Sequence, residues 1–224
     1  MKKGLFFIFQ LVLFGAFSGL AAQELTVEDS YLQTSEDLMV IEEFSNSQER
    51  EHKLSAVKSL EDLAKNGRKP EEARKILAKL SLEGTLFKEM QNGRIINNYP
   101  DVRERAVRAL ADFPGADAAK SLGDVIVNEK EPAVISAAID SLTKLKAFDD
   151  NTLNIVQFIL YQYNALANDS RLANSLLSYY DNCPPKPKVM SALSTIRDNP
   201  RYVPTVKHRA EQIFKKKGKA NTAR

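Results

Sequence analysis

Two short strings in the sequence have the spacing of a catalytic serine and its lysine partner. Ser55 and Ser141 are each followed three residues later by a lysine, Lys58 and Lys144. A nucleophile of the Ser-x-x-Lys type works together with a strand that carries Lys-Thr-Gly, and the sequence contains no such string. Both strings lie in segments of helical periodicity, where Ser and Lys are common on exposed faces. We therefore interpret them as helix surface rather than as nucleophiles.

The other side chains suited to acid–base or metal chemistry are few and scattered. His52 and His208 are the only histidines, and Cys183 is the only cysteine. A structural zinc site takes four Cys or His ligands, and a Cys–His nucleophile needs both residue types close together. The sequence also lacks a glycine-rich phosphate loop. We predict no catalytic residue, no metal and no cofactor, and we expect Cys183 to lie unreactive in a turn between helices.

The most informative polar residues form a stripe without charge. The segment 151–168 contains no charged residue and is largely apolar. Asn154, Gln157, Tyr161 and Asn164 recur at a spacing of three to four residues, so they share one helix face. Carboxamides on such a face can pair with the N–H and C=O groups of an extended peptide. The alternative is a central helix that is buried on both sides and has an uncharged rim.

A repeated unit of two helices explains how this stripe is positioned. Each copy begins near a proline or an aspartate, which suits the start of a helix, and continues with apolar residues at helical spacing. A small alanine lies on the apolar stripe of each copy. One such pair cannot bury its stripe alone, so neighbouring pairs must stack. The copies lie at residues 100–110, 132–142 and 204–214, with weaker ones around Ala56 and Ala173.

The unit resembles the HEAT repeat, specifically the bacterial HEAT-like repeats also found in phycobilisome lyases. The string Pro-Asp-Val-Arg-x-x-Ala-Val-x-Ala-Leu that starts at Pro100 matches this pattern closely, and the resemblance extends over roughly residues 48–216. It implies an all-α fold, a right-handed α-solenoid of stacked antiparallel helix pairs whose second helices line a concave face. HEAT proteins are mostly scaffolds and adaptors, and the related armadillo repeats hold peptides with an asparagine stripe. The resemblance therefore implies a protein or peptide partner at Asn154, Gln157, Tyr161 and Asn164.

The start of the chain has the features of a secretory signal peptide. Lys2 and Lys3 precede the apolar stretch 5–17, and small residues follow at 18–22. The apolar stretch is too short to span a bilayer comfortably. We predict a signal peptide at 1–22, cleaved after Ala21 or Ala22, and hence an exported protein of the periplasm or the extracellular medium.

Three further segments flank or interrupt the repeats. The acidic segment 23–47 is expected to form a capping helix that starts at Ser35, with Leu38, Ile41 and Phe44 on its apolar face. The solenoid is expected at 48–214, with an insertion at 82–99 that is too apolar for a free loop. We expect this insertion to fold back over the first repeat; the alternative is a projecting loop that binds a partner. The basic residues 215–224 are expected to form a tail without ordered structure, with at most weak contact to an anionic surface.

The charge balance argues against one class of function, the binding of nucleic acid. The formal net charge is +3, and two of these charges come from the predicted signal peptide, so we expect no nucleic-acid partner. The sequence thus predicts a non-catalytic protein-binding scaffold or adaptor in the cell envelope. The alternatives are an accessory or lyase-type envelope enzyme, or a HEAT protein that binds nucleic acid.

Overall fold

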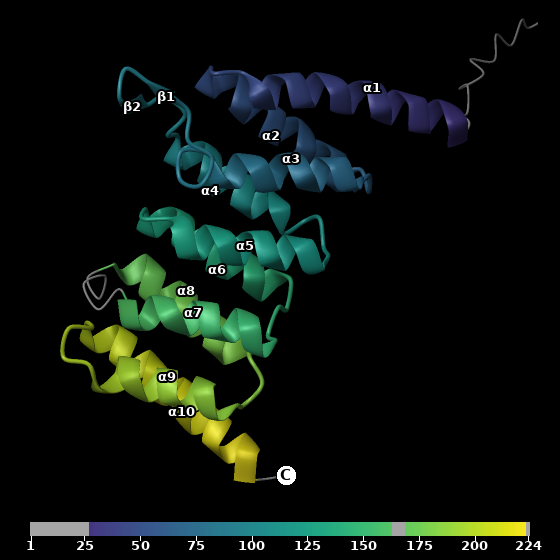
Figure 1. Cartoon of the computed structure of the whole chain (residues 1–224). Helices are drawn as coiled ribbons and strands as arrows, with labels where there is room; N and C mark the ends of the chain where they lie inside the picture. Colours follow the sequence, from purple (N-terminus) through teal and green to yellow (C-terminus); the bar gives the residue numbers. More distant parts are fainter. Residues whose placement is uncertain (1–26, 163–168, 223–224) are drawn as a thin grey trace, which may run out of the picture.

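Over the residues that it describes, the computed structural model forms helices and one small hairpin (Figure 1). It describes residues 27–162 and 169–222, and side chains at 36–161 and 169–219; the predicted signal peptide and Asn164 lie outside these ranges. The predicted all-α class is confirmed. The described elements are α1 (Val27–Asn46), α2 (Arg50–Lys65), α3 (Glu71–Leu82), β1 (Met90–Gln91), β2 (Arg94–Ile95), α4 (Pro100–Leu110), α5 (Ala116–Asn128), α6 (Pro132–Lys144), α7 (Asp150–Gln162), α8 (Ser170–Asn182), α9 (Pro187–Asp198) and α10 (Pro204–Thr222).

From α2 onward the helices alternate between two layers. The helices α2, α4, α6, α8 and α10 contact one another in succession, and α3, α5, α7 and α9 do the same in the second layer. Figure 1 shows α1 across one end of this stack and α10 at the other end. Because successive helices reverse direction, the helices within one layer run the same way. The hairpin and the connection between α9 and α10 lie on the same edge of the stack (Figure 1).

The core lies between the two layers and along the alanines of the repeated unit. Ala56, Ala106, Ala138 and Ala210 have no exposed surface, and Ala173 is 2% exposed. Their small side chains let neighbouring helices of the first layer approach closely. The repeated alanines therefore occupy the buried stripe that the sequence predicted for them.

The helix starts follow the expected chemistry. Pro100 and Pro132 lie in the first turns of α4 and α6, where a missing N–H has no intrahelical acceptor to lose. At α8 the side chain of Asp169 accepts hydrogen bonds from the backbone N–H groups of Arg171 and Leu172. By contrast, α1 begins at Val27 rather than at Ser35, so the predicted start of the capping helix is wrong.

The prediction of an unstructured tail from residue 215 is also wrong. Helix α10 continues to Thr222, and Lys217 is only 6% exposed. Its Nζ donates to the backbone oxygens of Asp181 and Cys183, at 2.9 and 2.5 Å. These oxygens belong to the end of α8, where carbonyl groups have no intrahelical donor, so a lysine supplies one. Burial lowers the pKa of the Lys217 ammonium group.

The insertion at 82–99 projects instead of covering the first helix pair. Strand β1 pairs with β2 in antiparallel register around Asn92 and Gly93, which both have positive φ. The side chain of Asn97 bonds to the backbone of Phe87 and Glu89, so it closes the hairpin on itself. The expectation that the insertion folds back is therefore wrong for its tip. The exposed apolar side chains there are Leu86, Phe87, Met90 and Ile95.

A chain of buried charges joins the first helix pairs. The Nζ of Lys53 lies 2.8 Å from a carboxylate oxygen of Glu83, and the Nε of Arg103 lies 2.6 Å from a carboxylate oxygen of Glu129. All four side chains are at most 5% exposed. The Nη1 of Arg103 also donates to the Glu83 carbonyl at 3.2 Å, which links the two pairs. Lys53 further donates to the Ser45 carbonyl of α1, so the chain runs from the capping helix to the end of α5.

Both glutamates follow the last residue of a second-layer helix. The Glu129 carboxylate accepts from the backbone N–H groups of Lys130 and Glu131, just before α6 begins. Burial raises the pKa of the Glu83 carboxyl, while Lys53 counteracts this shift. Each pair therefore fixes where a second-layer helix ends relative to a first-layer helix.

We predict that Arg103→Met lowers the free energy of unfolding by about 3–5 kcal/mol, because it leaves the Glu129 carboxylate buried without its cation. Arg105 on the same helix is the matched control. It pairs with Glu61 at 2.7 Å, but these side chains are 38% and 24% exposed. Arg105→Met should therefore cost no more than about 1 kcal/mol. Urea denaturation of both variants measures the difference; equal losses would contradict the structural role of the buried pair.

Candidate protein-binding surface

The predicted stripe lies on α7, and the structure describes three of its four residues. Asn154 is exposed, and its Oδ1 accepts a hydrogen bond from Lys188 Nζ of the neighbouring helix α9. Gln157 is half-buried and its Nε2 donates to the Tyr161 hydroxyl at 3.4 Å. Tyr161 is 53% exposed. The structure thus brings Gln157 and Tyr161 together and ties Asn154 to α9.

Helix α7 has one buried face and one open face. Leu153, Val156, Ile159 and Leu160 are buried in the core, whereas Phe158 is 45% exposed beside the stripe. The alternative of a helix buried on both sides is therefore not what the structure shows. Phe158 was not among the residues predicted for the partner-binding stripe. Its position, four residues after Asn154 and three before Tyr161, is the signal that would have placed it on the open face.

Helix α5 extends this surface. A Cβ atom at Gly123 would lie 3.0 Å from Ile155 Cδ1, so the two helices approach closely at that turn. Val127 lies one turn after Gly123 on α5, and because α5 and α7 run in the same direction we infer that it is level with the turn of α7 that follows Ile155 and carries Phe158. Val127 is 51% exposed. We refer to Val127, Asn154, Gln157, Phe158 and Tyr161 as the α5–α7 surface.

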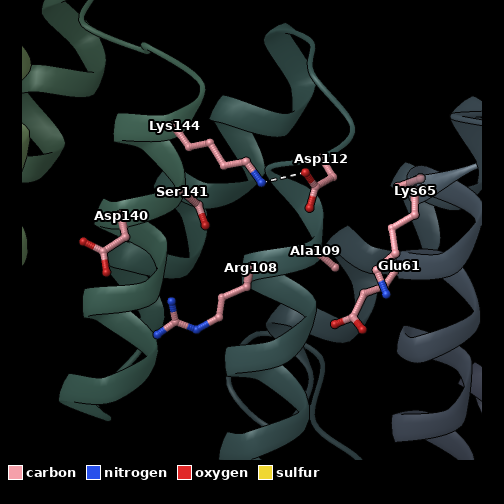
Figure 2. A pocket seen from close by; sticks show the side chains of 9 residues that line it. Glu61, Lys65, Arg108, Ala109, Asp112, Asp140, Ser141 and Lys144 are labelled. Carbon is pink, nitrogen blue, oxygen red and sulfur yellow. Dashed lines mark hydrogen bonds and ion pairs between the residues drawn. The ribbon is translucent and has the colours of Figure 1, made fainter. Parts of the chain in front are cut away.

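The other layer carries a hollow of different character. It has a volume of about 370 Å³ and lies between α2, α4 and α6, where Figure 2 shows acidic and basic side chains around its rim. Its lining consists of three acids (Glu61, Asp112, Asp140), three bases (Lys65, Arg108, Lys144) and three small residues (Ala64, Ala109, Ser141). The equal number of acids and bases gives the hollow no preference for a ligand of one charge.

Most of these charges are already engaged within the chain. Lys144 Nζ lies 2.6 Å from an Asp112 carboxylate oxygen, as the dashed line in Figure 2 marks. Arg108 pairs with Glu104 of its own helix at 2.9 Å. The Ser141 hydroxyl donates to the Val107 carbonyl at 3.0 Å. Lys144 and Ser141 therefore bind other partners, and this Ser-x-x-Lys string forms no nucleophile–base contact.

The remaining candidate chemical groups are dispersed. The ring of His52 stacks on Phe44 with centroids 5.0 Å apart, whereas His208 is exposed on α10. Cys183 is buried at the end of α8, and its burial raises the pKa of the thiol to about 11. Across residues 27–162 and 169–222, no group of three His, Cys, Asp or Glu side chains is placed to hold a metal ion. Over the same ranges, no helix combines the length and apolarity needed to cross a bilayer.

Comparison of the chain with protein-family models, curated proteins and solved structures found no match. The resemblance to HEAT-like repeats accordingly rests on the repeated unit itself.

The raised pKa of Cys183 predicts a thiol that resists alkylation in the folded protein. Only the thiolate reacts, and a pKa of about 11 leaves roughly one thiol in a thousand ionised at about pH 8. We expect iodoacetamide to modify Cys183 at least about 100-fold more slowly in buffer than in denaturant. A protein with Cys183→Ser and Ser55→Cys serves as the control, because Ser55 is exposed. If mass spectrometry gave similar rates for the two folded proteins, the buried position of Cys183 would be wrong.

Proposed function

We propose that the protein is a non-catalytic scaffold or adaptor of the cell envelope that binds a protein partner on the α5–α7 surface. The observation that carries this proposal is the exposure of Val127, Phe158 and Tyr161 on the neighbouring second-layer helices α5 and α7. Soluble proteins rarely expose contiguous apolar surface without a partner, and aromatic side chains are enriched at the centres of protein interfaces. Polar amides border these side chains, which is the arrangement of an apolar centre with a polar rim.

We further propose that the two layers form a right-handed solenoid of HEAT-like helix pairs. Three observations support it: the repeated sequence unit, the alternation of helices between layers, and the burial of the repeated alanines. In a HEAT-like solenoid the second helices, here α3, α5, α7 and α9, line the concave face. The α5–α7 surface would then lie on that face, where a partner makes contact over several repeats.

The amides of the surface favour a partner segment with an accessible backbone. Asn154 Oδ1 accepts from Lys188, which leaves its Nδ2 group to donate to a carbonyl of the partner. An apolar side chain of the same segment would lie against Phe158 and Val127. Lys188 remains beside the site as a cation, so an acidic residue next to that apolar side chain would be favoured.

Export places the partner outside the cytoplasm. The predicted signal peptide at 1–22 supports a location in the periplasm or the extracellular medium. The partner is therefore expected among exported or envelope proteins.

The test is partner capture by a double variant of the surface. Phe158→Ser with Tyr161→Ser should reduce the crosslinked partner recovered from intact envelopes by at least about tenfold, because two central aromatic contacts are lost. Its melting temperature should stay close to that of the parent, since both side chains are about half exposed.

The matched control removes two exposed apolar side chains of the hairpin, Phe87→Ser with Met90→Ser. This control should retain partner capture. Loss of capture in the hairpin variant, together with normal capture by the α7 variant, would move the binding site to the hairpin and refute the proposal.

A further inference from the structure

The two ends of the stack carry opposite charge. Helix α1 contains six acidic residues and no Lys or Arg, whereas α10 contains six Lys or Arg and one acidic residue. The helices have 20 and 19 residues, so each is about 30 Å long. They lie at opposite ends of the molecule (Figure 1), so they cannot neutralise each other within one chain.

The outer face of α1 combines acidic and apolar side chains. Glu36, Met39, Val40 and Glu43 follow the spacing i, i+3, i+4, i+7 and are all exposed, with Met39 at 70% and Val40 at 54%. The opposite face is buried on α2 and α3, as Ile41 shows. Glu43 also lies in the last turn of α1, where the carbonyl end of the helix dipole disfavours negative charge. A basic partner along this face would therefore be stabilising.

An acidic cleft lies beside this face, between α1 and α2. Its volume is about 510 Å³. Three carboxylates and one guanidinium line it, so its balance is acidic; Asp37 lies 3.4 Å from Arg68 across the cleft. The lining residues are Glu36, Asp37, Val40, Ile41, Ser59, Asp62, Leu63, Asn66 and Arg68.

Helix α10 has the complementary features. His208, Gln212, Lys215 and Lys219 are exposed at helical spacing, opposite the face that packs on α8 and α9. Lys215 pairs with Glu211 of its own helix at 3.0 Å, and Lys216 pairs with Asp181 at 2.8 Å. These lysine side chains are 70% and 69% exposed, so the pairs are weak and leave the lysines able to exchange partners.

We propose that α10 of one copy of this chain docks along α1 of a second copy, with its lysines at the acidic α1–α2 cleft. Met39 and Val40 form the apolar centre of the contact, and the charges determine its orientation. Because the two surfaces differ, the contact is head-to-tail and can extend to further copies. A contact between two helices of this length is small, so the association is weak and falls as salt screens the charges.

Sedimentation velocity of the purified chain over a range of concentrations tests this association. At about 50 mM salt the average mass should rise with concentration, and at about 500 mM salt the chain should be monomeric. Two charge reversals separate the surfaces: Glu36→Lys with Glu43→Lys on α1, and Lys215→Glu with Lys219→Glu on α10. Each variant alone should associate at least about tenfold more weakly, because like charges then face each other.

The most discriminating measurement is sedimentation of a mixture of the α1 and α10 charge-reversal variants. Each retains one unaltered surface, so the mixture should regain association that neither variant shows alone. Asp124→Lys with Glu131→Lys, two exposed residues in the middle of the stack, makes the same charge change as the α1 variant and should associate like the parent. A parent chain that stays monomeric at low salt, or association that persists in both reversed variants, would overturn the proposal.

Discussion

Close approach of neighbouring helices along the repeated alanines is the constraint on which the rest of the structure depends. Ala106 and Ala138 are fully buried, so α4 and α6 meet where no larger side chain fits without strain. That approach sets the spacing of the first layer, and the second layer follows because α5 packs on α6 and α7 packs on α5. The small residues of α4 and α6 thus determine indirectly where the α5–α7 surface lies, although neither helix contributes to that surface.

Buried polar contacts fix how far each helix is shifted along its neighbour. Removing charges from water is costly, and a buried pair offsets that cost only when its geometry is good and its other hydrogen-bonding groups are satisfied. Arg103 meets this condition by binding Glu129, the Glu83 carbonyl and Asn98. Towards the other end of the stack, Tyr179 and Lys217 bind backbone carbonyls of Ala147 and Cys183. The same solution therefore recurs: a long polar side chain satisfies the carbonyls where a helix ends.

The sequence was sufficient where periodicity and local chemistry decide the outcome. The repeated pattern predicted helices at Pro100 and Pro132 and the buried alanines, because each depends on spacing within one helix. For α7 it left open whether the polar stripe faces solvent or a neighbouring helix. Prediction from the sequence failed where a contact with a residue distant in the chain determines the position of a side chain. Lys217 is packed because the end of α8 needs a donor, and composition alone made it look like part of a solvated tail. The hairpin was missed for a different reason: Asn97 binds the backbone of Phe87 and Glu89 within the insertion, and the apolar composition of the segment did not indicate this contact.

The central claim is that the open face of α7 contacts a protein partner, and photocrosslinking in intact cells tests it most directly. A photoreactive phenylalanine analogue would replace Phe158, and in parallel it would replace Phe87 on the hairpin, which is exposed to a similar extent. Irradiation should yield a discrete adduct, larger than the chain alone, from the analogue at position 158 and little or none from position 87. Absence of any adduct at position 158, with a clear one at position 87, would contradict the account.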